Sequence, residues 1–334
     1  MKYILACCCI LNVQLVIAQG RLIHFTPTLF YNKFSLNQKP VLTIHDGDTV
    51  NTETTDAFGF DKQGVRRQGG GNPLTGPFYI TEAKEGAVLA ITLIKVALNR
   101  SYAFTTETFA SRSLPDSFVK QFKKFHVVKW KLDLENMLGS VDSSYTPYTH
   151  LRDFKIPLQP FLGCIGVAPA NKKNEILSFF QGNFGGNLDY SSIKQGATVY
   201  LPVLHNGAYL YIGDGHAVQG DGEIAGNALE TSMDVSFSVK LIKRETLQIN
   251  YPRAEDVNYI MAIGTGKTLD KALKIATANL LAWLQKDYGL TLQEATQFMS
   301  AAIEYTIAEI ADPEVTVAAK VKKEILKRLN TPKH

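Results

Sequence analysis

The sequence predicts an α+β fold, in which a β-rich, sandwich-like core is followed by C-terminal helices that pack on one side of it. From residue 20 to about residue 245, short apolar runs alternate with clusters of Gly, Asn, Asp and Pro, as expected for strands joined by turns. After residue 252 the apolar residues take up helical spacing. We therefore expect the core over residues 19–250 and a helical part of the same domain over residues 251–334.

Residues 1–18 predict a secretory signal peptide. Lys2 is followed by an apolar run from Ile4 to Val16, which is too short for an ordinary membrane-spanning helix. Val16 and Ala18 fit the small-residue positions that precede a cleavage site. We expect cleavage after Ala18 and export to the periplasm or the medium, with no membrane association afterwards.

The composition of the 334 residues excludes several classes of function. Hydrophobic residues make up 45% and charged residues 20%, which is typical of a globular protein. The net charge of +4 comes without a basic run, so we expect no nucleic-acid partner. Loss of the signal peptide would leave Cys164 as the only cysteine, which excludes an internal disulfide. Its apolar surroundings favour a buried, unreactive thiol over a nucleophile.

Turn signals divide the first part of the chain into strands. Two strands are expected around the Asp46-Gly47 turn, and a short and a long strand around the Glu85-Gly86 turn. The stretch ATVYLPVLHNGAYLYIGDGH predicts a hairpin on Asn206-Gly207, because this dipeptide suits a type I′ turn. A further strand follows, in which one face is formed by Met233, Val235, Phe237, Val239 and Leu241.

Capping residues mark the helices of the C-terminal part. Thr268 is a plausible N-cap and Gly289 a C-terminal cap of a first helix. Thr291 and Glu294 form the capping box of a second helix, expected to run to about Ile310. The tail AAKVKKEILKRL is expected to form a third, shorter helix. The first helix carries an apolar stripe formed by Leu273, Ala276, Leu280 and Leu284, widened by Trp283.

The glycine-rich stretch YIGDGHAVQGDGEIAG, residues 211–226, contains the candidate site. Asp214 and His216 are two positions apart on a predicted strand, so their side chains emerge on one face. An unpaired buried charge is costly, and a bound cation would remove that cost. An Asp and His pair with one further oxygen ligand, from Asp221 or Glu223, suits a catalytic zinc with an open position. The alternative, that Asp214 caps a turn and His216 is a satisfied pocket histidine, stays open.

The stretches QGNFGGNLDYSSI and ATVYLPVLHNGAYLYIGDGHAVQGDGEIAGNALET resemble the acetamidase/formamidase family, whose core reads roughly G-N-x-G-G-N-x-D, then G-D-x-H-A-x-Q-G-D-G-E, then A-x-E-T. The resemblance implies a metal-dependent, homo-oligomeric enzyme that hydrolyses a small carboxamide to a carboxylate and ammonia. It also implies a β-rich fold with appended helices. The family's motif residues fall on Asn183, Asn187, Asp189, Asp214, His216, Asp221, Glu223 and Glu230.

On this resemblance we expect Asp214 and His216 to hold a divalent metal, with Glu223 as the third ligand ahead of Asp221. Zinc is the favoured ion and calcium the alternative. Catalytic roles fall to Glu230 as general base, to Asp189, and to the amides of Asn183 and Asn187, which would face the oxyanion. The expected partner is a formamide- or acetamide-like substrate.

The alternative function is an exported, non-catalytic ligand-binding module that is stabilised by calcium bound to the same acid-rich loop. Calcium prefers six to eight oxygen ligands and rarely takes a histidine. The imidazole of His216 among the acids therefore favours the hydrolase.

Overall fold

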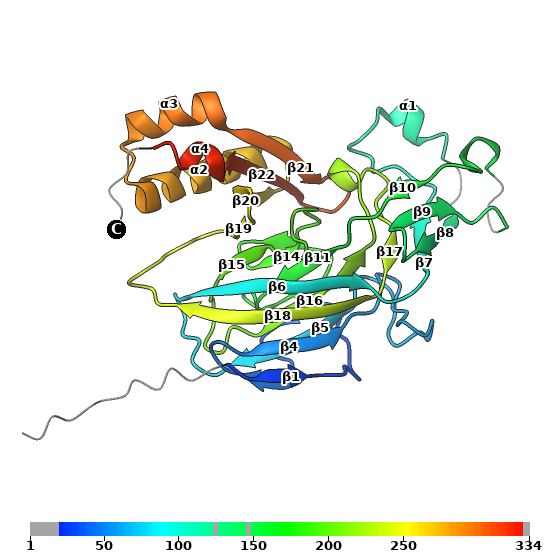
Figure 1. Ribbon diagram of the computed structural model, residues 1–334, viewed down its shortest axis with the longest axis horizontal. Helices are drawn as coiled ribbons and strands as arrows, with labels where there is room; N and C mark the ends of the chain where they lie inside the picture. Colours follow the sequence, from blue (N-terminus) through cyan, green and yellow to red (C-terminus); the bar gives the residue numbers. More distant parts are fainter. Residues whose placement is uncertain (1–19, 123–125, 145–147, 330–334) are drawn as a thin grey trace, which may run out of the picture.

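The computed structural model of the protein describes residues 20–122, 126–144 and 148–329. The predicted signal peptide lies outside the described residues. Two large β-sheets form most of the fold, and the two longest helices gather at the C-terminal end of the chain (Figure 1). This confirms the predicted β-rich α+β class. No helix within the described residues is both long enough and apolar enough to cross a membrane.

The first sheet has nine strands and contains residues from both ends of the chain. Its strands, in spatial order, are β1 (Leu22–His24), β4 (Thr49–Glu53), β18 (Met233–Ile242), β6 (Val88–Leu98), β15 (Thr198–Pro202), β19 (Arg253–Glu255), β20 (Tyr259–Gly266), β22 (Val315–Lys322) and β21 (Glu304–Glu309). The predicted alternating strand at 233–241 is confirmed as β18, whose Met233, Val235, Phe237 and Val239 are buried.

The second sheet has eleven strands and carries the candidate site. Nine lie in the order β10 (Ile156–Pro157), β9 (Leu138–Val141), β8 (Val127–Asp133), β7 (Tyr102–Thr106), β17 (Glu230–Thr231), β16 (Leu210–His216), β11 (Phe161–Gly166), β14 (Gly185–Asn187) and β13 (Gln181–Gly182). Beside β16 lies β5 (Leu74–Ile80), which pairs with β3 (Leu42–Ile44). A separate pair is formed by β2 (Lys33–Ser35) and β12 (Glu175–Leu177).

The two large sheets pack on a common apolar core. Phe78 of β5 and Phe237 of β18 meet across it with ring centroids 5.3 Å apart. Buried residues of both sheets belong to the same apolar cluster, among them Ile91 of β6 and Ile212 of β16. Burial of these apolar side chains between the two sheets stabilises the sandwich-like arrangement.

The hairpin predicted at Asn206-Gly207 is wrong. The turn exists, but it joins β15 of the nine-stranded sheet to β16 of the eleven-stranded sheet. Three consecutive residues, Gly207, Ala208 and Tyr209, have positive φ values of 85°, 54° and 56°, and they redirect the chain from one sheet to the other. The Asn206-Gly207 dipeptide therefore predicted the position of the turn correctly, but not that the strands on either side of it belong to different sheets.

The predicted helix caps are confirmed. In α2 (Leu269–Tyr288), the Thr268 side chain accepts a hydrogen bond from the Lys271 amide, and Gly289 has φ 67° at the C-terminal end. The α3 helix (Leu292–Ala302) has the complete Thr291 capping box. Leu273 does not belong to the buried stripe of α2, because 40% of its surface is exposed.

The prediction that residues 251–334 are mainly helical is wrong in part. The second helix ends at Ala302 and not near Ile310, and the tail forms β22 before the short helix α4 (Lys323–Leu326). β21 and β22 pair with each other, and β22 pairs with β20, so they extend the nine-stranded sheet under α2. Three shorter helical turns complete the described fold: α1 (Asp116–Val119), η1 (Thr149–Leu151) and η2 (Asp221–Glu223).

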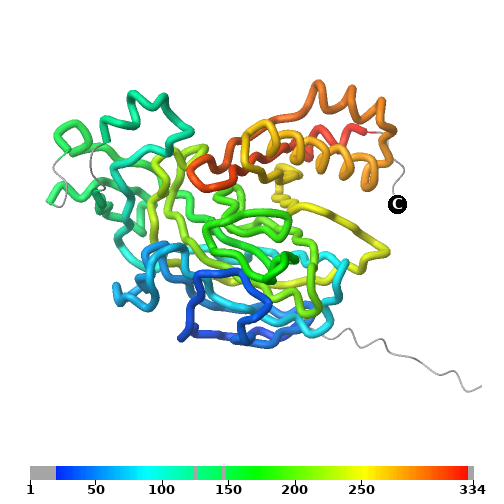
Figure 2. Tube along the Cα trace, turned by 180° about the vertical axis from the view of Figure 1, so that it is seen from behind, coloured from blue at the N-terminus to red at the C-terminus, as the bar shows by residue number. Residues whose placement is uncertain are grey.

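The connection between β21 and β22 contacts the glycine-rich loop that follows β16. Figure 2 shows these two segments side by side, and the Ile310 amide donates a hydrogen bond to the Gly222 carbonyl at 3.0 Å. The C-terminal part therefore contributes directly to the surroundings of the candidate site.

Candidate functional site

Adjacent strands of the eleven-stranded sheet place the candidate site residues next to one another. Asp214 and His216 lie on β16, and Glu230 on β17 is directly opposite His216 in the antiparallel pairing. Asp189 follows β14 on the other side, where its amide donates to the Gly163 carbonyl of β11 at 3.2 Å. Residues from three separate parts of the sequence are thereby brought within contact distance.

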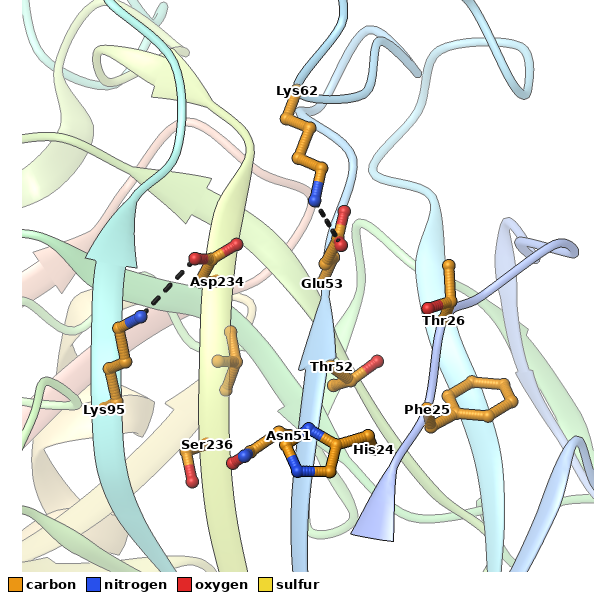
Figure 3. A pocket seen from close by; sticks show the side chains of 11 residues that line it. His24, Phe25, Thr26, Asn51, Thr52, Glu53, Lys62, Lys95, Asp234 and Ser236 are labelled. Carbon is orange, nitrogen blue, oxygen red and sulfur yellow. Dashed lines mark hydrogen bonds and ion pairs between the residues drawn. The ribbon is translucent and has the colours of Figure 1, made fainter.

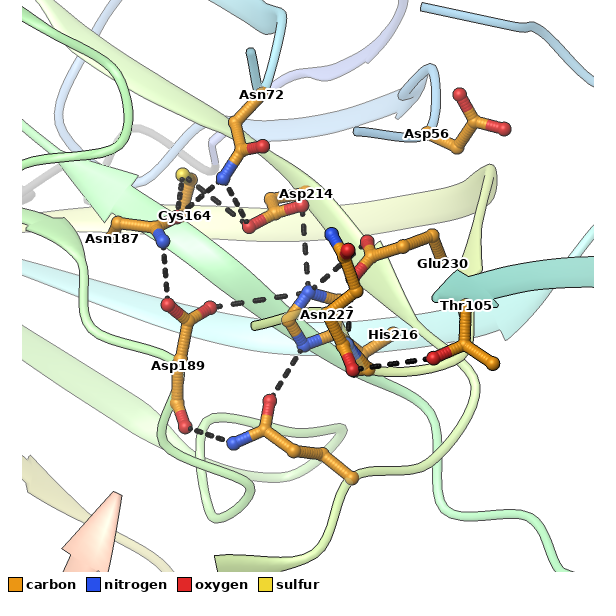
Figure 4. Close-up of polar contacts among 12 residues, drawn as sticks. Asp56, Asn72, Thr105, Cys164, Asn187, Asp189, Asp214, His216, Asn227 and Glu230 are labelled. Atoms are coloured by element: carbon orange, nitrogen blue, oxygen red, sulfur yellow. Dashed lines mark hydrogen bonds and ion pairs between the residues drawn. The ribbon is translucent and has the colours of Figure 1, made fainter. Parts of the chain in front are cut away.

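Four of these side chains converge on one point (Figure 4). His216 Nε2 lies 3.3 Å from Glu230 Oε2, 3.4 Å from Asp214 Oδ1 and 3.9 Å from Asp189 Oδ1. All four residues are at most 1% exposed. None of these four atoms has a hydrogen-bond partner among the described residues. Burying polar atoms without partners raises the free energy of the folded state. A bound cation, or protons on some of these groups, would remove that cost.

Gln219 determines which imidazole nitrogen faces the carboxylates. Its Nε2 donates to the carbonyls of Asp189 at 2.8 Å and Ala308 at 3.1 Å, which directs its Oε1 to His216 Nδ1 at 2.9 Å. Nδ1 must then donate, because an amide oxygen can only accept. The neutral imidazole therefore presents the Nε2 lone pair to the carboxylates, which is the tautomer that binds a metal.

Protonation of His216 alone would leave some of the buried carboxylate oxygens without a partner. Burial lowers the pKa of His216, but the Glu230 and Asp214 carboxylates outweigh it and hold this pKa well above its usual value. Burial raises the pKa of Glu230 to about 7 and also raises that of Asp189. A single Nε2 proton can bond to only one of the three carboxylates, whereas a divalent cation can contact all of them. The donor set therefore fits a divalent metal better than a protonated histidine.

The backbone around the cluster takes up unusual conformations. Asp189, Asp214 and Glu223 have φ values of 43°, 57° and 46°. These values lie in the left-handed region, which residues other than glycine rarely adopt. Such strain persists only where the surrounding structure enforces it, and it gathers at functional sites. The cluster also requires a glycine at position 163, because a Cβ there would overlap Asp189 Oδ1 and lie 2.8 Å from Asp214 Oδ2.

Two predicted site residues, Asp221 and Asn183, do not lie in the cluster. Asp221 is exposed at the start of η2, because Gly222 with φ 85° turns the chain so that the next residue, Glu223, points inward. Asn183 is exposed at the turn between β13 and β14. Alternation and motif position could not distinguish these outward side chains from their buried neighbours.

Glu223 and Asn187 are both buried at the site. Glu223 groups with Asp189 and His216, and its ligand atom lies within 4.8 Å of theirs, whereas Asp214 and His216 group with Glu230. Asn187 Nδ2 already donates to Asp189 Oδ2 at 2.5 Å and to Asp312 Oδ2 at 2.8 Å. Its amide hydrogens are therefore engaged by carboxylates and are not free to face an oxyanion.

Several residues of the site were missed from the sequence. Asn72 donates to Asp214 Oδ2 at 2.9 Å, and Gln219 orients the imidazole as described above. Glu309 is the last residue of β21, in a segment that was assigned to a helix, and Asp312 lies in the connection from β21 to β22. Only Gln219 had a usable signal, since it lies three positions after His216 in the glycine-rich stretch.

Cys164 lies at the edge of the cluster, and the prediction that its thiol is buried is confirmed. Its Sγ–H donates to Asn187 Oδ1, and the side chain is fully buried. Burial, reinforced by the nearby Asp214 carboxylate, raises the pKa of the thiol well above its usual value. A thiol of this kind is a poor nucleophile.

A hollow on the outer face of the nine-stranded sheet is a weaker candidate (Figure 3). It has a volume of about 270 Å³ and lies between β1, β4 and β18. Its charged residues already pair with each other, because Lys62 contacts Glu53 at 2.5 Å and Lys95 contacts Asp234 at 3.4 Å.

The role of Gln219 is open to a direct test. We expect Gln219→Leu to lower the affinity for zinc by about 10–100-fold, because His216 would lose the partner that fixes its tautomer and ring orientation. Competition with a chromophoric chelator measures this affinity. The exposed Gln63→Leu serves as the matched control and should bind zinc as the parent chain does. An unchanged affinity in Gln219→Leu would show that His216 does not depend on this hydrogen bond.

Known proteins of one family match this chain in sequence and in structure. The Acetamidase/Formamidase family model matches residues 181–328. A protein of Schizosaccharomyces pombe named as a formamidase is 43% identical over 60 residues, which is 18% of this chain and 15% of the length of that protein.

Solved structures extend the match to nearly the whole chain. An acetamidase from Bacillus halodurans has a TM-score of 0.77 and 26% identity, covering 92% of this chain and 100% of its own. An acetamidase from Yersinia enterocolitica has a TM-score of 0.79 and 30% identity, covering 92% of this chain and 93% of its own. The resemblance seen in the sequence is confirmed by these matches, and this chain belongs to the acetamidase/formamidase family of amidases.

Proposed function

We propose that this chain is a metal-dependent hydrolase that converts small linear carboxamides, similar to formamide or acetamide, to a carboxylate and ammonia. One observation carries the metal dependence: Nε2 of His216 and a carboxylate oxygen from each of Asp189, Asp214 and Glu230 converge, and no described residue hydrogen-bonds to any of these four atoms. One imidazole with carboxylates is a donor set that suits zinc, whereas calcium rarely takes a histidine.

Asp214, His216 and Glu230 are the residues that would hold the cation, because their ligand atoms form the group with the shortest contacts to Nε2. Glu230, expected from the family resemblance to be the general base, becomes a ligand in this proposal. A divalent cation supplies an activated water and a polarised carbonyl to amide hydrolysis. Three protein ligands leave a position open for these groups.

Asp189 is the residue to which we assign proton transfer to the leaving amine. Its Oδ1 is the next carboxylate oxygen from His216 Nε2, at 3.9 Å, and it has no hydrogen-bond partner in the part of the chain that the structure describes. Its other oxygen is held by Asn187, which keeps the carboxylate in one orientation. A positioned carboxylate of this kind typically contributes about 10²–10⁴-fold to the rate.

The proposed function predicts ammonia release that depends on a metal. The purified chain should release ammonia from formamide, acetamide or propionamide, lose this activity on exhaustive chelation, and regain it when zinc is added back. Elemental analysis of the chelated protein confirms that the metal has been removed. Activity in a metal-free preparation would contradict the metal dependence. A folded protein that hydrolyses none of the three amides would contradict the amidase and favour a calcium-stabilised binding module.

Export and homo-oligomeric assembly remain part of this proposal. Export is supported by the signal-peptide pattern of residues 1–18, and assembly by the family resemblance. N-terminal sequencing of the mature protein would test cleavage after Ala18, and light scattering coupled to size-exclusion chromatography would measure the number of subunits.

A further inference from the structure

Asp56 and Arg100 form an ion pair that is almost completely buried. Nη2 of Arg100 donates to Asp56 Oδ2 at 2.5 Å, and the two residues are 4% and 0% exposed, Arg100 being the former. A buried ion pair gives little net stability, because withdrawing two charges from water costs about as much free energy as their attraction returns. Figure 4 shows Asp56 on the same side of the cluster as Glu230. The metal centre proposed above uses neither member of the pair as a ligand.

Arg100 bonds to both residues of β17, the strand that carries Glu230. Its Nη2 donates to the Glu230 carbonyl at 3.3 Å, and its Nε donates to the Thr231 hydroxyl at 3.1 Å. The same Nε lies 3.1 Å from the Tyr102 carbonyl of β7, and the guanidinium carbon lies 4.4 Å from the centre of the Tyr102 ring. Since β17 consists of these two residues alone, the guanidinium links a very short strand to its neighbour β7.

Asp56 fixes the orientation of this guanidinium. Its Oδ1 accepts the amides of Phe58 at 3.0 Å and Phe60 at 2.8 Å, which leaves Oδ2 for Arg100. A carboxylate held at both oxygens cannot rotate freely. On the other arm of the guanidinium, Nη1 donates to the carbonyls of Phe60 at 3.5 Å and Asp61 at 3.4 Å. Residues 56–61 therefore hold Arg100 in the one position from which it reaches β17.

The position of the Glu230 carboxylate follows that of its own backbone. Oε1 accepts the Ala228 amide at 2.8 Å, so one oxygen is held by the chain two residues earlier. Pairing with β16 places Glu230 opposite His216, and Oε2 then lies 3.3 Å from His216 Nε2. A displacement of β17 would therefore move Oε2 relative to the imidazole.

We propose that Asp56 and Arg100 are positioning residues, which hold β17 where Glu230 Oε2 can bind the cation. This inference rests on the proposed metal centre at His216. Neither residue touches the cation or the substrate, and both act through the backbone of Glu230. The planar fork of arginine suits this role, because lysine offers a point charge that cannot bond to the same set of acceptors.

Binding of Co²⁺ to the metal-free, full-length chain tests this role without using activity. Cobalt takes the nitrogen and oxygen sites that zinc takes, and its visible absorption reports the geometry of its ligands. We expect Arg100→Lys and Asp56→Asn to bind Co²⁺ about 10–100-fold more weakly than the parent chain, as is typical when a partner of a metal ligand is lost. Their visible spectra should also differ from that of the parent. A pair that only stabilised the fold would lower the melting temperature and leave the spectrum unchanged.

The ion pair between Arg21 and Asp48 provides matched controls. Its N–O distance is also 2.5 Å and its carboxylate is also buried, but it lies on the nine-stranded sheet, where Asp48 precedes β4. Arg21→Lys and Asp48→Asn make the same chemical changes away from the cluster. Both should keep the Co²⁺ affinity and the visible spectrum of the parent chain.

The outcomes separate this inference from the metal centre on which it rests. An unchanged affinity and spectrum in a folded Arg100→Lys variant would overturn the positioning role and leave the metal centre intact. Equal changes in Arg21→Lys and Asp48→Asn would do the same. A parent chain that binds no Co²⁺ would overturn both proposals. Circular dichroism shows whether each variant is folded, and Asp56→Asn provides the test if Arg100→Lys is not.

Discussion

Replacing His216 with alanine is expected to reduce amidase activity by more than about 10³-fold. The loss of one oxyanion donor in an enzyme already costs about 10²–10³-fold, and removal of this imidazole takes away the only nitrogen ligand of the proposed centre. The cation and the activated water would be lost together. The measurement compares the rates of ammonia release by His216→Ala and by the parent chain. It uses whichever of formamide, acetamide and propionamide the parent chain hydrolyses fastest, with zinc in excess.

The control for this substitution is His24→Ala. His24 is exposed on β1 and lies away from the eleven-stranded sheet. This variant should keep the parent activity and melting temperature, and circular dichroism shows whether each variant is folded. A His216→Ala variant that keeps full activity would show that His216 neither holds a catalytic cation nor takes part in the reaction.

Gly163→Ala is expected to inactivate the protein although it replaces none of the proposed ligands. The added methyl would overlap Asp189 Oδ1 and lie 3.0 Å from His216 Cε1, so at least one of these side chains must move. Both are buried in a closely packed sheet, where such displacements are costly. Misplacing reacting groups by about 1 Å can cost about 10²-fold in rate. We therefore expect at least this loss of activity, together with weaker zinc binding.

Gly69→Ala is the matched control for this methyl group. No atom lies within 4 Å of a Cβ built on Gly69, and its backbone does not require a positive φ. Activity and zinc affinity should stay at the parent values. If Gly163→Ala behaves in the same way, the space between Asp189 and His216 does not need to be clear, and the proposed arrangement of ligands is wrong.

Capping residues predicted where the two helices begin, whereas the sequence did not predict which strands pair with each other. Thr268 and the Thr291 capping box act within one turn of chain, so their effects can be read from neighbouring residues. The pairing of β21 with β22, and of β22 with β20, joins segments through contacts that no local pattern records. Apolar residues of this region fit a helix and a strand equally well until the partner is known.

The site was predictable where its residues are close in sequence. Asp214 and His216 are two positions apart on a strand, and their contact follows from the alternation of side chains. Glu230 reaches them by cross-strand pairing, and its position was known only from the family motif. Glu309 was missed because its segment was assigned to a helix. Asp221 was included because the positive φ of Gly222, which turns Asp221 outward, cannot be read from the sequence.

Anomalous diffraction at the zinc absorption edge, from crystals of the zinc-loaded chain, would locate the cation itself. We expect a peak about 2.0–2.2 Å from His216 Nε2 and at a similar distance from one carboxylate oxygen of Asp214 and one of Glu230. A zinc-loaded crystal with no peak among these three residues, or with its peak on exposed side chains, would contradict the proposed centre and the hydrolysis assigned to it.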